Sequence, residues 1–293
     1  MITQLYLLEI EKHMNSNNPL AKHFRHPAIH YKLPSGGKYW PEGSLNLPLN
    51  GEIPIYPMTT RDEIVLRTPD ALMNGAGIVD VIQSCCPNII DAWQMPSVDV
   101  DAVLIAIRIA SYGGEMEIET KCPKCEEEAN YDIPLAPILD GIHAPDYTKE
   151  IKTGGVYIAF KPQAYFIATK INIVRFQEDQ IIRTISNQDV TDQERKQIFD
   201  EQLKRLVDLN MDMITESTAY IKTDSDEKVR DSVYIKEFYN NCETKVMKQV
   251  RAHLETLKQA SVIPEQSATC ASCNHNFKLA MEFDQASFFG TGS

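Results

Sequence analysis

Four of the seven cysteines form two pairs with the same spacing. Cys122 and Cys125 enclose Pro-Lys, and Cys270 and Cys273 enclose Ala-Ser. A gap of two residues lets one tight turn direct both thiolates at one ion, and two such turns supply the tetrahedral ligand set that structural zinc prefers. The sequence therefore predicts one structural zinc ion, bound by all four thiolates.

The segments beside the pairs alternate apolar and polar residues, as half-buried strands do. Residues 115–120 and 129–135 flank the first pair, and residues 276–283 follow the second, with one apolar face made by Phe277, Leu279, Met281 and Phe283. We interpret the two halves as one zinc ribbon, split by the residues between the pairs. The alternative is two unrelated pairs of buried or redox-active thiols.

The remaining cysteines are interpreted as core residues. Cys85 and Cys86 are adjacent and cannot easily face one ion, and Cys242 is placed on an apolar helical stripe with Val246, Val250, Leu254 and Leu257. His275 follows the second pair and is expected to be an exposed turn residue. A proline-interrupted arm carries three more histidines and is expected to be solvated and to contact a partner chain: His23, His26 and His30.

Composition limits the class of protein. The chain has 293 residues, with 41 Asp and Glu against 29 Lys and Arg, for a net charge of −12. Nucleic acid is a poor partner for such a surface, because its binding relies on clustered basic residues. The start lacks the basic residues of a signal peptide, and Glu9 and Glu11 interrupt its apolar run. We expect folding in a reducing cytoplasm, where paired cysteines favour metal over disulfides.

The pattern of elements predicts an α+β fold: a mixed N-terminal domain with a split zinc ribbon and a large helical insertion. The predicted parts are an N-terminal helix and arm (1–26), a mixed α/β domain with the first zinc knuckle (27–140), the helical insertion (141–265), and the second knuckle with a C-terminal strand (266–293). In the insertion, three helices are expected: one with Ile167, Ile171, Val174, Ile181 and Ile185 on one face, one opened by a capping box at 191–194, and one over about 227–258.

In the mixed domain, residues 60–63 predict a capping box, and Pro69 a helix start. Residues 97–112 predict a buried helix closed by Gly113 and Gly114. Residues 36–38 are Gly-Gly-Lys, but the loop is too short for a phosphate cradle, and Tyr39 replaces the hydroxyl that would bind magnesium. We expect a hairpin turn there.

No catalytic motif emerges from the sequence. It contains neither a Gly-x-Ser-x-Gly elbow nor a His-Glu-x-x-His helix. Four thiolates also close the zinc shell and leave no position for a reactive water. The expectation is a protein that is not an enzyme and has no small-molecule substrate.

An ordered series of segments resembles a known family. The series comprises residues 32–43, 52–72, 81–89, 101–113 and 122–125. Together they are similar to baseplate proteins of contractile-tailed bacteriophages, specifically the baseplate hub or hub-assembly family. The resemblance covers roughly residues 27–140. It implies a structural or assembly role in the virion tail baseplate, after synthesis in the host cytoplasm, with other baseplate and tail proteins as partners and no membrane or nucleic acid.

Two other classes of function remain open. One is a zinc-stabilised phage protein that binds a host factor and is absent from the virion. The other is a thiol enzyme using one cysteine pair, although redox cysteines usually lie at a helix start and these pairs are predicted between strands.

Overall fold

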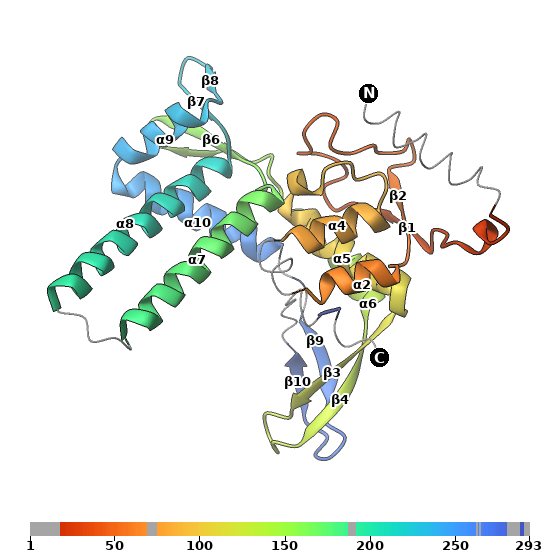
Figure 1. Ribbon diagram of the computed structural model, residues 1–293. Helices are drawn as coiled ribbons and strands as arrows, with labels where there is room; N and C mark the ends of the chain where they lie inside the picture. Colours follow the sequence, from red (N-terminus) through yellow and green to blue (C-terminus); the bar gives the residue numbers. More distant parts are fainter. Residues whose placement is uncertain are drawn as a thin grey trace.

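The computed structural model describes residues 18–68, 75–186, 192–261, 263, 265–279 and 288–289, without the side chains of 175 and 178–195. The fold is α+β, as predicted, and Figure 1 shows three parts. We call them the core lobe, the ribbon arm and the distal lobe. The predicted N-terminal helix, the helix start at Pro69, the capping residue Thr191 and the strand residues 280–283 lie outside the described residues.

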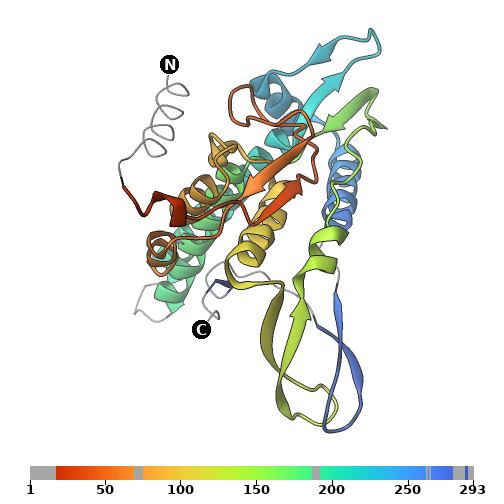
Figure 2. The same ribbon diagram turned by 90° about the vertical axis from the view of Figure 1, so that its right-hand side faces the viewer.

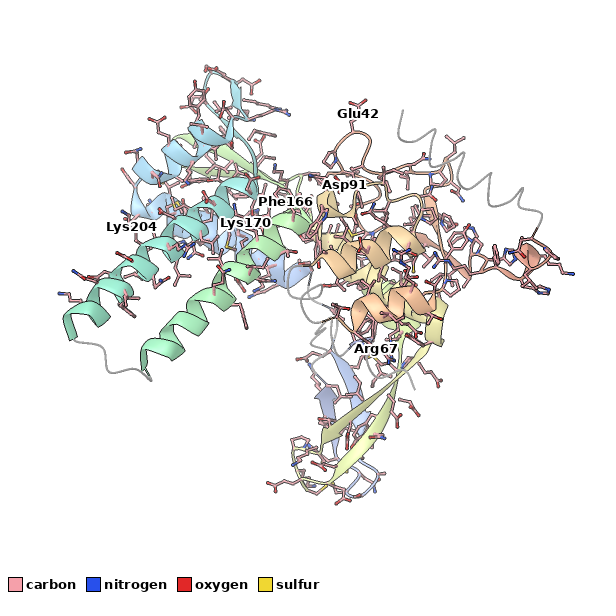
Figure 3. The ribbon with its side chains drawn as sticks, viewed as in Figure 1. Glu42, Arg67, Asp91, Phe166, Lys170 and Lys204 are labelled. Carbon is pink, nitrogen blue, oxygen red and sulfur yellow. The ribbon has the colours of Figure 1, made fainter. Side chains whose placement is uncertain are left out.

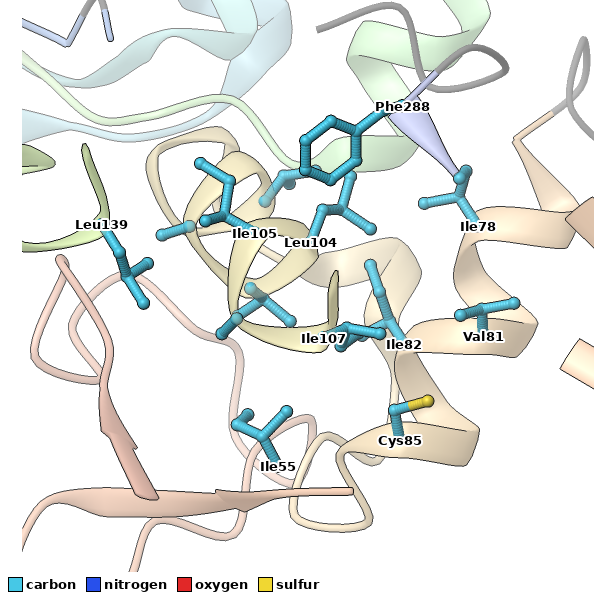
Figure 4. Packing of buried hydrophobic residues seen from close by; sticks show 14 of the residues in the cluster. Ile55, Ile78, Val81, Ile82, Cys85, Leu104, Ile105, Ile107, Leu139 and Phe288 are labelled. Atoms are coloured by element: carbon cyan, nitrogen blue, oxygen red, sulfur yellow. The ribbon is translucent and has the colours of Figure 1, made fainter. Parts of the chain in front are cut away.

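The core lobe contains the first elements of the chain and one buried helix, α5. Its elements are η1 (Ala21–His23), β1 (Ile29–Lys32), β2 (Glu52–Ile55), α2 (Thr60–Leu66), α4 (Ala76–Cys85), η2 (Ala92–Gln94), α5 (Ser97–Tyr112) and α6 (Leu135–Gly141). Helix α5 is apolar nearly all round and ends at Gly113, whose φ of 98° suits glycine. Figure 4 shows α4 and α5 contributing Ile82, Cys85, Leu104 and Ile107 to the same core.

The distal lobe combines a sheet with four helices. It comprises β5 (Ile151–Thr153), β6 (Val156–Phe160), α7 (Tyr165–Ser186), α8 (Asp192–Glu216), β7 (Thr218–Lys222), β8 (Lys228–Val229), α9 (Ser232–Asn241) and α10 (Thr244–Ala260). The four strands pair in chain order and are antiparallel throughout. A second apolar cluster joins this sheet to α9 and α10.

The predicted division of the chain into four parts, with boundaries after residues 26, 140 and 265, stays a prediction.

The prediction of a third helix over about 227–258 was wrong. The chain first forms the β7–β8 hairpin, whose turn contains Asp226 at φ 66°. Asp231 then caps α9, and the helix ends before Cys242, so that α10 begins separately at Thr244. Cys242 is half-buried against the cluster that contains Val246, but it is not on the same helix as the rest of the predicted stripe.

Two further local predictions need correction. The capping box lies one residue earlier than expected: Thr59 is the N-cap, and Asp62 is its reciprocal partner. Strands β1 and β2 pair, but residues 33–51 join them as a long loop rather than a tight hairpin turn. Within that loop, Gly37 has φ 78°, a left-handed conformation that favours glycine, and an added Cβ would also displace the Leu47 side chain, whose Cδ2 would lie 2.7 Å away.

The N-terminal arm is not wholly solvated as predicted, because Arg25 fixes it to the core lobe. The Arg25 guanidinium donates to the carbonyl oxygens of Pro57 at 2.7 Å and Ser84 at 2.8 Å, and lies 3.3 Å from Asp62. These partners lie beside α2 and α4, so one side chain holds the arm against both helices.

A seam of backbone contacts joins the two lobes. The Ser97 N–H donates to the Gln163 carbonyl oxygen, and the Tyr165 N–H donates to the Met95 carbonyl oxygen, both at 2.8 Å. The rings of Trp93 and Tyr165 stack with centroids 6.0 Å apart. We call residues 93–97 and 163–165 the lobe seam. It lies at the base of α7, where the distal lobe begins (Figure 1).

Asp99, buried in the first turn of α5, holds the loop after β1. Its carboxylate accepts from the Ser35 N–H at 2.8 Å, the Ser35 hydroxyl at 2.6 Å and the Trp40 indole N–H at 2.9 Å. A buried charge needs such compensation, because desolvation is costly. Near the other end of α5, buried Arg108 donates to the Phe288 carbonyl oxygen and lies over the Tyr112 and Phe288 rings.

Asp99→Ala is expected to destabilise the protein by about 2–4 kcal/mol, because the buried donors of Ser35 and the half-buried indole N–H of Trp40 lose their acceptor. Denaturant unfolding measures the change. Asp80→Ala, an exposed change on α4, is the matched control and should be close to neutral. A neutral result for Asp99→Ala would contradict the assigned role of this carboxylate.

Candidate metal centre

Two antiparallel hairpins form the ribbon arm. Strand β3 (Glu115–Lys121) pairs with β4 (Glu128–Pro134), and β9 (Gln266–Thr269) pairs with β10 (Asn276–Leu279). The predicted strands around both pairs are thus confirmed as far as they are described. The hairpins lie side by side and project from the core lobe (Figures 1 and 2). Both cysteine turns lie at the hairpin tips.

The two turns have the same backbone geometry. In each, the residue after the second cysteine donates its N–H to the carbonyl oxygen of the first cysteine at 2.9 Å. That residue has a positive φ, 59° at Glu126 and 52° at Asn274. Asn tolerates this left-handed conformation better than most residues, so Asn274 was a usable signal in the sequence, whereas Glu126 gave none.

The four predicted ligands come together in one cluster. Cys122 Sγ lies 3.7 Å from Cys273 Sγ, and Cys125 Sγ lies 3.6 Å from Cys270 Sγ. All four sulfur atoms are within 4.8 Å of one another. A tetrahedral ion with metal–sulfur bonds of about 2.3 Å has sulfur–sulfur edges of about 3.8 Å, so that the cluster could hold one metal ion.

The four thiols differ in acidity. The first thiol of each pair accepts hydrogen bonds from backbone N–H groups of its own turn. These bonds lower the pKa of Cys270 to about 6. Desolvation raises the pKa of Cys122, but the hydrogen bonds outweigh it, so that the pKa of Cys122 is also lowered. The N–H of Glu127 favours ionised Cys125, but hydrogen bonds with the surrounding thiols raise the pKa of Cys125 to about 12. Desolvation raises the pKa of Cys273. Ionising all four together requires a cation among them.

The other candidate ligands lie elsewhere. Cys85 and Cys86 are fully buried in the core lobe, as predicted, and desolvation raises the pKa of Cys85 to about 12. His275 is half-buried rather than exposed: its ring stacks on Phe277 at 6.3 Å, and it is outside the cysteine cluster. Within the described ranges, His23 and the other arm histidines belong to no potential metal cluster.

Comparison with protein families shows which family this chain belongs to. The model of the T4 bacteriophage base plate protein family matches residues 26–290, which include both cysteine turns, the lobe seam and nearly all of both lobes. The chain belongs to this baseplate family. The match extends the resemblance found in residues 27–140 across the distal lobe. Neither the curated proteins nor the solved structures gave a match.

Membership of a baseplate family has direct consequences. It implies a structural role in the phage tail baseplate and association with other phage structural proteins. Among the helices of the described ranges, none has the length and apolar character needed to span a bilayer.

Replacing one cysteine from each turn tests whether the tips share one ion. Cys122→Ser and Cys270→Ser should each reduce bound metal from about one ion per chain to well below that, because each removes a thiolate from the same tetrahedron. Elemental analysis of freshly purified, unchelated protein measures the content. Cys242→Ser changes a thiol outside the cluster and should retain the metal. Loss in only one of the two turn variants would contradict a shared site.

Chelation should loosen the ribbon arm before the lobes separate. The turns lie at the distal tips, whereas the lobe seam joins the lobes through its own hydrogen bonds. Hydrogen exchange should therefore accelerate in residues 115–134 and 266–279 and stay slow at the Ser97 and Tyr165 amides. Equal acceleration at the seam would show that the metal, rather than the seam, fixes the distal lobe.

Proposed function

We propose that this baseplate protein is a structural or assembly component of the hub or wedge region of a contractile phage tail, acting by binding other tail proteins. The observation that carries the proposal is the family match over residues 26–290. The ordered segments from Leu33 to Cys125, which resemble the hub or hub-assembly family, support the hub more than another part of the baseplate.

We further infer that the metal is zinc and that its role is structural. Four thiolates suit zinc or iron–sulfur chemistry, and a closed tetrahedral shell is typical of structural zinc. Such an ion would hold the two tips together and remove chain entropy from the unfolded state, because the intervening loop is long. Elemental analysis distinguishes the two metals: iron in place of zinc would overturn this assignment.

No reaction is proposed for this chain. The support is the closed shell, which offers no open coordination position for water or substrate. A turnover by the pure protein that one Asp, Ser or His substitution abolishes would contradict a purely binding role.

Complementation of a phage lacking this gene tests the assembly role. Without the protein, tails are expected to stall before sheath polymerisation, because a baseplate component is missing. The Cys270→Ser, Cys273→Ser double variant should lower the yield of infectious particles, and Cys242→Ser, the control, should support normal yield. Plaque titre and electron microscopy of the tails measure both effects.

The outcomes separate the parts of the proposal. Normal particles without the protein would refute the assembly role, and normal particles with the double variant would refute the need for the metal. Mass spectrometry of purified tails addresses residence in the virion. A protein present in infected cells, absent from tails and dispensable for their assembly would instead be one that acts on a host factor.

A further inference from the structure

Helix α8 carries an exposed apolar stripe. Phe199, Leu203 and Val207 follow one another at intervals of four residues and are 59, 52 and 53% exposed. This spacing places them on adjoining positions of one helix face. Lys204, labelled in Figure 3, lies next to Leu203 on the part of α8 that extends away from the core lobe. The lobe's own packing therefore leaves this face uncovered.

The stripe leads into a cavity of about 670 Å³. Asn210 and Ile214 continue the same helix face and line the cavity from α8, and Leu254 lines it from α10. Residues 161–163 and Ser97 also line the cavity, so that it reaches the lobe seam at Ser97 and Gln163. The exposed stripe and the cavity are thus continuous, forming what we call the α8–α10 groove. A cavity of this volume accommodates several large side chains.

Positive charge gathers on the α10 side. Helix α10 carries one acidic residue, Glu255, against four basic ones, in a chain whose net charge is −12: Lys245, Lys248, Arg251 and Lys258. Arg251, Lys258 and Lys161 line the cavity, where Glu255 is the one acidic lining residue. Within the described part of the chain, none of these three cations forms an ion pair. The groove therefore offers unpaired cations beside an apolar stripe.

We propose that the α8–α10 groove binds an amphipathic helix of another tail protein, with apolar residues against α8 and carboxylates toward α10. The path from Phe199 to Ile214 is about 22 Å along α8, the length of a four-turn helix. A helix of this kind buries residues at i, i+3, i+4 and i+7, which matches a groove lined by two helices. The acidic flank is required by charge complementarity with Arg251, Lys258 and Lys161.

This inference rests on the proposed binding function and names the chemistry of one partner. A synthetic helical peptide of about 15 residues serves as the probe, with leucines on one face and glutamates beside them. A second peptide carries lysine at every glutamate position. Fluorescence anisotropy measures the binding of each to the full chain. The glutamate peptide should bind at least about tenfold more tightly than the lysine peptide.

Variants locate the binding. Leu203→Glu should weaken the glutamate peptide by about tenfold or more, while Leu49→Glu, at a leucine that is 109% exposed and outside the groove, should leave it unchanged. Arg251→Glu combined with Lys258→Glu should reverse the preference, so that the lysine peptide binds better. Because all these side chains are exposed, the variants should fold, and circular dichroism with denaturant unfolding checks this.

Four results would overturn the proposal. They are no binding up to about 1 mM, equal binding of the two peptides, an equal loss in Leu49→Glu, or sedimentation showing that the chain dimerises through Leu203. The last would make a second copy the occupant. The peptide measurement is independent of the phage complementation experiment. If neither peptide binds but the phage still needs the protein to assemble tails, the docking proposal for the α8–α10 groove is wrong and the proposed function still stands.

Discussion

The burial of α5 is the constraint on which the rest of the structure depends. A helix that is apolar nearly all round must be covered on every side, and its neighbours come from both halves of the chain. Two buried polar side chains of α5 then determine which segments pack against the helix. Asp99 holds the loop after β1 through Ser35 and Trp40, and Arg108 holds the segment at Phe288. Because a buried polar group without a hydrogen-bond partner is costly, these hydrogen bonds place both segments specifically.

The cysteine cluster concerns the stability of the ribbon arm rather than that of the core lobe. The chain passes through the ribbon arm twice, once before and once after the whole distal lobe, and each hairpin is short and marginal by itself. A metal ion bound by the four cysteines would join the two tips and turn two weak hairpins into one unit. The lobe seam would be independent of this closure, since its hydrogen bonds at Ser97 and Tyr165 lie at the base of α7, away from the hairpin tips (Figure 1). The arm and the distal lobe are therefore fixed by separate interactions.

The sequence was sufficient where a pattern has one physical meaning. Two Cys-x-x-Cys pairs predicted their own convergence, and the continuous apolar run of 97–112 predicted a buried helix. It was insufficient where short signals compete. The β7–β8 hairpin was missed because five strand residues between two helices carry little periodicity, and the helix break at Cys242 has no proline or glycine to mark it. The α8–α10 groove could not be predicted from the sequence, because it depends on how α8 and α10 are placed relative to each other and not on the pattern of either helix alone.

A protein that works by binding gains from surfaces that are already in place, because each segment that must be ordered on association lowers the affinity. Here Arg25 fixes the arm, Asp99 fixes the loop of residues 33–40, and the seam fixes the base of α7 beside the groove. In a chain whose net charge is −12, the four basic residues of α10 against one acidic residue give the proposed docking site a charge that complements an acidic helix. For the proposed α8–α10 docking site, a fixed seam at its base and basic residues already in place on α10 would lower the ordering that association requires.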